Sequence, residues 1–117
     1  MSRKMLERKL DRAVREIVLS RDSRCITCDC ELTEFNATPG HYMKRRHRTT
    51  RWDTRNVNGQ CLECNVEDDN EAYRDAMIRR YGAKVTREIE VLAHTEIHFT
   101  ESELKIFLIK MRSENNL

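Results

Sequence analysis

The residues best suited to chemistry are four cysteines, arranged in two pairs of equal spacing. Cys25 and Cys28 form one Cys-x-x-Cys pair, and Cys61 and Cys64 form the other. Two such turns can complete a closed tetrahedral zinc site. The alternative is four buried thiols that serve as small apolar side chains. The doubled spacing favours zinc, in a structural role, because four protein ligands leave no position for water.

A fifth cysteine, Cys30, follows the first pair at a distance of two residues. We expect it to be an ordinary free thiol. The alternative is that it competes with Cys28 as a metal ligand.

A candidate general base, His41, lies between the two cysteine pairs. A neutral imidazole can take up a proton near neutral pH, so a histidine at this place is a candidate for catalysis. Gly40 precedes it and permits close approach of backbone or ligand at this point. The alternative is that His41 is a structural or solvent-exposed histidine.

Oxygen ligands follow the second cysteine pair. Asn65 comes directly after Cys64, and Asp68 and Asp69 come three and four residues later. If the pair opens a helix, these three side chains share one face of its first turn. Hard oxygen ligands grouped in this way suit Mg²⁺ or Mn²⁺. The alternative is that they cap the helix and favour its positive end.

A run of basic residues without an acid follows His41. We expect it to hold DNA phosphates through counterion release, with little sequence discrimination. The alternative is a solvated loop. The cations of this run are Lys44, Arg45, Arg46, Arg48 and Arg51.

Composition predicts one small domain with a thin core. The chain has 117 residues, of which 38% are hydrophobic and 36% are charged. A short chain of this kind typically needs a disulfide, a metal or a partner subunit to stabilise its fold. It lacks both a membrane-spanning apolar run and the apolar core of a secretory signal, so we expect a cytoplasmic protein, in which paired cysteines bind metal.

Helical periodicity marks both ends of the chain. Apolar residues at helical spacing predict a helix from about Lys4 to Arg21, and Gly82 is placed to end another helix that follows Cys61. A short helix should follow, and a last one should begin at the capping box of Thr100 and Glu103.

The centre of the chain reads as loops and short strands, with residues 41–43 and the segment around Trp52 as the expected strand pair. The domain is therefore divided into an N-terminal helix (1–22), a metal-bound centre (23–82) and C-terminal helices (83–117). The class is α+β and mostly helical.

The order of these motifs resembles the phage NinG (Rap) recombination nucleases, over roughly residues 10 to 112. The resemblance implies a zinc-bound treble-clef (ββα-metal, HNH-like) centre. The metal scaffold is also similar to that of phage endonuclease VII. The motifs that carry the resemblance are the first Cys-x-x-Cys pair, Gly40-His41-Tyr42, Arg55-Asn56-Val57, Gln60-Cys61-x-x-Cys64-Asn65 and Tyr81-Gly82.

The resemblance also implies roles for three residues. His41 matches the general base, Asn65 matches the asparagine that binds the catalytic metal, and Asn56 matches the asparagine that braces the histidine-bearing loop. One departure is that many HNH enzymes have an acidic ligand immediately before the histidine, where this chain has Gly40. We expect the missing carboxylate to come first from Asp68 and second from Asp69.

The implied activity is metal-dependent cleavage of Holliday junctions and D-loops, by a phage-encoded enzyme in the host cytoplasm. The alternatives are a zinc-stapled module that binds nucleic acid without cutting it, and a zinc-stapled protein-interaction domain. Cutting two strands of a junction favours a homodimer. Apolar stripes on the first and last helices offer surfaces for it, unless the two helices pack on each other within one monomer.

Overall fold

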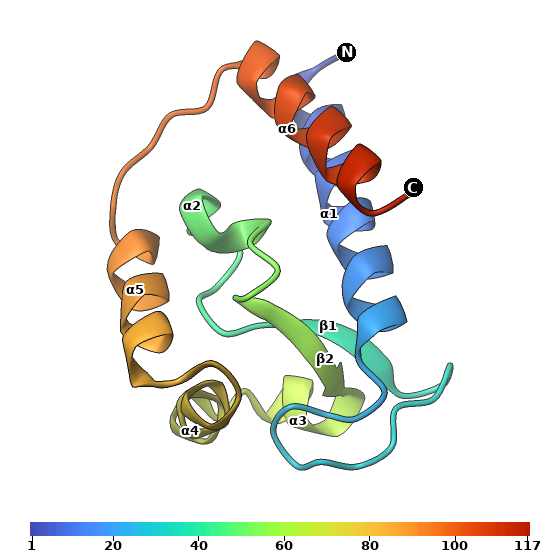
Figure 1. Cartoon of the computed structure of the whole chain (residues 1–117), viewed down its shortest axis with the longest axis vertical. Helices are drawn as coiled ribbons and strands as arrows, with labels where there is room; N and C mark the ends of the chain where they lie inside the picture. The colour runs from blue at the N-terminus through green and yellow to red at the C-terminus, as the bar shows by residue number, and fades with distance from the viewer.

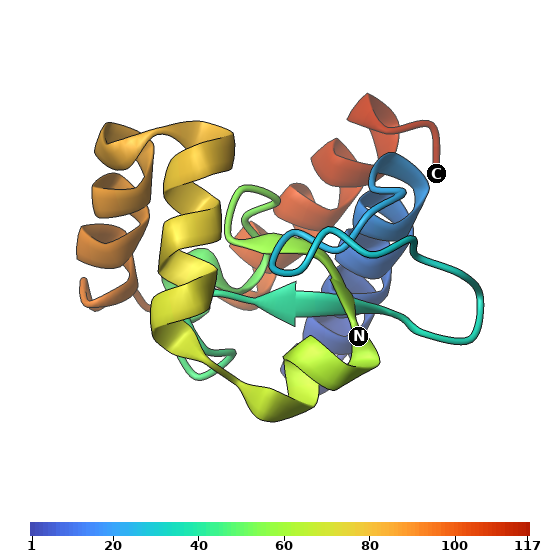
Figure 2. The same ribbon diagram turned by 90° about the horizontal axis from the view of Figure 1, so that it is seen from below.

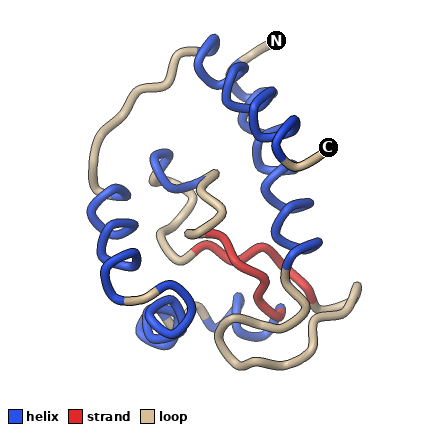
Figure 3. Tube along the Cα trace, viewed as in Figure 1, coloured by secondary structure: helices blue, strands red, loops and turns tan.

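The computed structural model describes all 117 residues as six helices and one two-stranded sheet (Figures 1 and 3). This confirms the mostly helical α+β class. In chain order the elements are α1 (Arg3–Arg21), β1 (Ala37–His41), α2 (Arg48–Arg51), β2 (Val57–Cys61), α3 (Leu62–Glu67), α4 (Asn70–Tyr81), α5 (Ala83–Ala93) and α6 (Glu101–Glu114).

The first and last helices pack side by side and form the main core (Figure 1). The predicted α1 is confirmed, with Ser2 as its N-cap. The capping box of Thr100 and Glu103 at the start of α6 is also confirmed. Helix α1 is therefore an intramolecular partner for the apolar stripe of α6. The buried residues of this cluster are Leu6, Leu10, Ala13, Val14, Val18, Trp52, Val57, Leu104, Leu108 and Met111.

The two strands form an antiparallel hairpin in which His41 pairs with Val57 and Ala37 pairs with Cys61. The expected strand pair was wrong, because strand β1 ends at His41 and Trp52 follows the short helix α2. The apolar residue at position 52 does not mark a strand. The Trp52 side chain is part of the core that α1 and α6 form. The real strands, Ala-Thr-Pro-Gly-His and Val-Asn-Gly-Gln-Cys, lack the alternation of apolar residues that identifies a strand in sequence.

Strand β2 is buried along its whole length although it is polar. Side-chain hydrogen bonds make this burial tolerable. The Asn58 side chain donates to the Tyr73 hydroxyl at 3.2 Å and accepts from the Tyr81 hydroxyl at 2.6 Å. These hydrogen bonds tie the hairpin to α4 through pairs that local sequence cannot reveal.

Helix α4 lies on the side of the hairpin away from α1 and α6, and α5 packs on α4 and α2 (Figure 2). A second apolar cluster of Tyr42, Tyr73, Met77 and Ile89 lies there. The expected end of α4 at Gly82 is confirmed, since its φ of 89° suits glycine. None of the helices has the length and apolar character needed to cross a membrane.

Candidate functional site

The four cysteines of the two pairs converge on one point. Their sulfur atoms all lie within 4.8 Å of one another. The Sγ atoms of Cys28 and Cys61 are 3.8 Å apart. Thiolates on one tetrahedral zinc, at about 2.3 Å from the metal, lie about 3.8 Å apart. The cluster therefore has the donor type and spacing for a structural metal such as zinc.

Two local turns build this cluster. After Cys25, the chain turns back at Asp29, whose φ is 63° and whose amide donates to the Cys25 carbonyl at 2.9 Å. Cys61 is the N-cap of α3, and its sulfur accepts from the Cys64 amide at 3.4 Å. Each turn presents two thiols, which is the arrangement that the spacing predicted.

Strand β2 positions the first turn against the second. The Ile26 amide donates to the Gly59 carbonyl at 2.9 Å, and the Gly59 amide donates to Asp22 at 2.7 Å. A Cβ at residue 59 would lie 2.7 Å from Leu32 and 2.8 Å from Asp22, so only glycine fits this close approach.

The fifth cysteine lies beside the cluster but is not one of the four converging residues. The backbone amide of Cys30 faces the Cys28 sulfur and lowers the pKa of Cys28 to about 7. A thiol that is easily ionised is a better metal ligand. Cys30 thus assists the site through its backbone.

A separate cleft of about 490 Å³ holds His41. It lies between α1, the start of the segment after β1, and α3. Asn65 lines the same cleft, so the fold brings His41 and Asn65 together although 24 residues separate them. The other residues around it are Asp11, Arg12, Val14, Arg15, Pro39, Lys44, Arg45 and Arg51.

The His41 ring is held in one orientation by a backbone contact. Its Nε2 lies 3.0 Å from the Arg51 carbonyl oxygen. A carbonyl can only accept, so Nε2 carries the proton and the lone pair of the neutral ring is on Nδ1. Burial lowers the pKa of His41 below its usual value, and the charge of Arg45 lowers it further. The imidazole is therefore neutral at pH 7 and able to accept a proton at Nδ1.

Asn56 connects the two ends of the segment between the strands. It is fully buried. Its side-chain nitrogen donates to the carbonyls of Met43 at 3.0 Å and Thr50 at 3.1 Å, and its oxygen accepts from the Met43 amide at 2.8 Å. Because Thr50 precedes Arg51, these hydrogen bonds also hold in place the carbonyl that orients His41.

The two aspartates after Asn65 do not share its helix face. Helix α3 ends at Glu67, because Asp68 adopts a left-handed conformation with φ 54°. The expectation of one common face was therefore wrong. Asp69 is the N-cap of α4 and accepts from the Ala72 amide at 3.0 Å, which is the capping alternative. The exposed Asp68 carboxylate is paired with Lys44.

Asn65 itself keeps a free ligand atom. Its side-chain nitrogen donates to the Thr38 hydroxyl at 3.0 Å, and this hydroxyl donates to the Gln60 carbonyl at 2.7 Å. The side-chain oxygen of Asn65 makes no hydrogen bond within the protein. It is the atom that an oxygen-seeking cation would use.

Most cations of the basic run are paired with acids of α1. Arg51 donates to Asp11 at 2.7 Å, Arg45 reaches the same carboxylate at 2.9 Å, and Arg48 lies 3.0 Å from Glu7. Only Arg46 makes no ion pair. The segment is therefore anchored to α1, so it is not simply a solvated loop.

Asp11 is the centre of this anchor. It also accepts from the Trp52 indole at 2.8 Å. Burial alone would raise the pKa of Asp11, but the hydrogen bonds from Arg51 and Trp52 outweigh burial and keep the pKa below its usual value. Asp11 thus remains charged and fully engaged, and it fixes the backbone beside His41.

Two arginines that the sequence reading missed, Arg12 and Arg15 of α1, also line the His41 cleft. Both are exposed and make no ion pair. With Arg8 they form the i, i+4, i+7 spacing of one helix face, a signal that was available in the sequence. The basic surface of the cleft therefore comes from α1 as well as from the run after His41.

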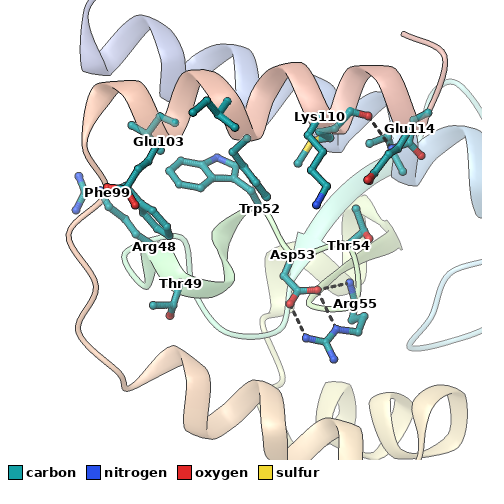
Figure 4. Close-up of a pocket in the computed structure, with 16 residues that line it drawn as sticks. Arg48, Thr49, Trp52, Asp53, Thr54, Arg55, Phe99, Glu103, Lys110 and Glu114 are labelled. Atoms are coloured by element: carbon teal, nitrogen blue, oxygen red, sulfur yellow. Dashed lines mark hydrogen bonds and ion pairs between the residues drawn. The ribbon is translucent and has the colours of Figure 1, made fainter.

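A hollow of about 710 Å³ lies elsewhere, between α6 and the segment of α2 and its following loop (Figure 4). It is lined by apolar side chains such as Phe99 and Trp52, whose ring centroids lie 6.2 Å apart, and by the ion pair of Arg55 and Asp53. It holds none of the predicted catalytic residues.

The family comparison covers nearly the whole chain. The family model described as Bacteriophage Lambda NinG protein matches residues 1–116. The comparisons with curated proteins and with solved structures found no match.

Proposed function

Because this chain belongs to the recombination-associated family of the bacteriophage lambda NinG protein, we propose that it is a metal-dependent endonuclease for branched DNA such as Holliday junctions and D-loops. The observation that carries the proposal is the orientation of His41. Its Nε2 is fixed on the Arg51 carbonyl, and its Nδ1 is left to accept a proton in a cleft bordered by arginines.

His41 is proposed to take a proton from the attacking water. General-base catalysis requires a neutral base within hydrogen-bond reach of that water. The low pKa of His41 keeps it neutral, and the Arg51 carbonyl stabilises the imidazolium that forms, because Nε2 continues to donate to it. Arg12 and Arg15 would hold the phosphates that flank the scissile bond.

Asn65 and Asp68 are the residues proposed to hold one Mg²⁺ or Mn²⁺ ion. Both side chains are exposed and offer an oxygen. Asp68 would give up its ion pair with Lys44 to bind the metal, and a surface ion pair of this kind contributes little free energy. When bound, the ion supplies charge neutralisation at the scissile phosphate and the leaving oxygen. Asp69 is the second choice, because one of its oxygens already caps α4.

The order of elements supports a treble-clef, HNH-like centre. A turn with two cysteines comes first, a hairpin with His41 at the end of its first strand follows, and a helix that begins at the second cysteine pair completes the unit. This order is compatible with the ββα-metal arrangement that the resemblance implies, and it supports the proposal of such a centre here.

Cleavage of a labelled four-way junction tests the proposal. We expect nicks with Mg²⁺ or Mn²⁺ and none without added divalent ion. Asn65→Ala should abolish cleavage, while Asn70→Ala, an exposed asparagine at the start of α4, should not. Imidazole added to His41→Ala should restore part of the rate if His41 is the base. Cleavage that is unchanged in both site variants would refute the assignment.

A non-catalytic nucleic-acid-binding module is the second candidate. One observation favours it: the only carboxylate that lines the cleft, Asp11, is held by Arg51, Arg45 and Trp52. In that case junction binding would persist, and no divalent ion would produce nicks on any branched, single-stranded or duplex substrate.

We also propose that the chain acts as a homodimer, since two strands of a junction must be cut. Helix α6 leaves Ile106 and Ile109 exposed although it packs on α1. Sedimentation at micromolar concentration tests this. A 14.0 kDa species that still makes paired nicks would exclude an obligate dimer.

A further inference from the structure

A second cationic hollow, of about 610 Å³, lies on the other side of the basic run. Three parts of the chain line it: the start of α1, residues 46–49, and the connection from α5 to α6 that Figure 1 shows as a long loop. Only one acid, Glu96, is among its lining residues. The cationic or ionisable bases there are Arg3, Arg46, His47, Arg48, His94 and His98.

The packing of this hollow leaves its outer cations without an ion pair or a hydrogen bond. The Thr49 hydroxyl donates to the Leu92 carbonyl at 2.6 Å and joins α2 to the end of α5. The rings of His47 and His94 meet edge to face at 5.0 Å. The side chains of Arg46, His94 and His98 are exposed and make no ion pair or hydrogen bond. Exposed cations that gather around one hollow, with a single acid, favour an anionic ligand.

The two cationic hollows share the segment between β1 and β2. Lys44, Arg45 and Arg51 line the His41 cleft. Arg46 and His47 line the second hollow. Neighbouring residues of one anchored segment thus serve two different hollows. A branched DNA presents two arms that leave one point, and each arm carries a dense row of phosphates.

We propose that the second hollow binds backbone phosphates of a second arm of the DNA whose first arm lies in the His41 cleft. This inference rests on the proposed action on branched DNA. It assigns selectivity for branched over linear DNA to Arg46, His94 and His98. Phosphate contacts carry no sequence information, so recognition here depends on the shape of the DNA.

His47 makes this contact sensitive to pH. Its imidazole gains charge as the pH falls, so binding of phosphate should strengthen in that direction. The titratable and charged groups that line the hollow with His47 are Arg46 and Arg48 beside it, Arg3 of α1, and His94, Glu96 and His98 of the connection. Partial burial and the charge of Arg46 lower the pKa of His47, so that it gains its proton at a lower pH than a free imidazole.

The test compares binding of a four-way junction with binding of a linear duplex, without added divalent ion. The test variant combines three substitutions in one chain: Arg46→Gln, His94→Gln and His98→Gln. The matched control, Arg79→Gln, Lys84→Gln, Arg87→Gln, removes three exposed charges of α4 and α5. Affinities are measured over a salt series at pH 6 and pH 8, and circular dichroism checks that both variants are folded.

We expect the test variant to bind the junction about tenfold more weakly at pH 6, with little change for the duplex, because only the junction reaches both hollows. The slope of the logarithm of its binding constant against the logarithm of the salt concentration should become less steep, by about 0.9 for each DNA phosphate that the variant no longer neutralises. Both variants should still bind more tightly at the lower pH, because both retain His47. An equal loss on junction and duplex, or no loss on either, would overturn the proposal.

The outcome is separable from that of the proposed function. Arg46→Gln alone removes one exposed side chain that makes no hydrogen bond or ion pair, so we expect the variant to fold. Its loss of junction preference should be smaller but of the same sign. If the wild type never cuts but shows this preference, the nuclease proposal fails, while the proposal that the second hollow binds a DNA arm is supported. If it cuts and the test variant loses no junction preference, only the second hollow is refuted.

Discussion

The cysteine cluster and the His41 cleft lie toward opposite ends of the same hairpin but are assembled differently. The Ala37–Cys61 end joins the cysteines, and the His41–Val57 end opens to the cleft. The cluster is made by two local turns, each of which presents two thiols, and strand β2 joins the two turns. The cleft needs α1, the basic run and α3 at once. One site should therefore govern stability, and the other should govern chemistry and binding.

Loss of a cysteine ligand should have the largest effect on stability. Cys25→Ser should release zinc and lower the free energy of unfolding by several kcal/mol, because structural zinc contributes about 10–16 kcal/mol in zinc-finger peptides. Urea unfolding and a zinc assay measure both. Cys30→Ser is the matched control and should be nearly silent. A folded, metal-free protein after chelation would contradict this prediction.

Loss of the base should affect chemistry far more than stability. His41→Ala should reduce junction cleavage by about 100-fold or more, on the order of general-base catalysis, with little change in junction affinity. Single-turnover rates and binding anisotropy separate the two. If the variant cuts at the normal rate, His41 is not the base.

Loss of Asp11, which holds the basic run on α1, should lower both the stability and the rate of cleavage. Asp11→Asn removes the charge that holds Arg51, Arg45 and Trp52, and should cost about 1–3 kcal/mol of stability. It should also slow cleavage, because the Arg51 carbonyl would no longer fix His41. Asp75→Asn, an exposed aspartate of α4 without such hydrogen bonds, is the control. Equal stability of the two variants would show that Asp11 is not the anchor.

The arginines of α1 should affect binding alone. Arg12→Gln with Arg15→Gln should weaken binding of every DNA and reduce the salt slope by about 0.9 for each phosphate that they neutralise, with cleavage at saturating protein preserved. A salt series on duplex and junction measures this. An unchanged slope would place DNA elsewhere on the surface.

The smallest effect should be the change of stability and of cleavage rate with pH that the titration of His41 causes. Because burial lowers its pKa, the folded protein holds this ring neutral at pH values where the unfolded chain is already protonated. The stability from His41 is therefore present above its unfolded pKa of about 6.5 and is lost as the pH falls through the folded pKa. The rate of cleavage should fall on the acid side with the same lowered pKa. A rate that falls already above pH 6.5 would contradict this.

Local signals predicted much of the fold. The apolar period of α1, the capping box of Thr100 and Glu103, and the glycine at residue 82 each act within a few residues, so they were legible in the sequence. The hairpin was misplaced because its strands are polar and are stabilised from outside. Asn58 is buried against Tyr73 and Tyr81, 15 and 23 residues away in sequence.

By itself, the sequence determined that four thiols converge, since each Cys-x-x-Cys pair forms its own turn and the two pairs need only one connection through β2. Only the tertiary structure decided which cations are free. The run after His41 looked uniform, yet Asp11 and Glu7 of α1 neutralise three of its arginines and leave Arg46 open, while α1 adds Arg12 and Arg15 to the cleft. Charge pairing depends on distance in space, which the order of residues does not contain.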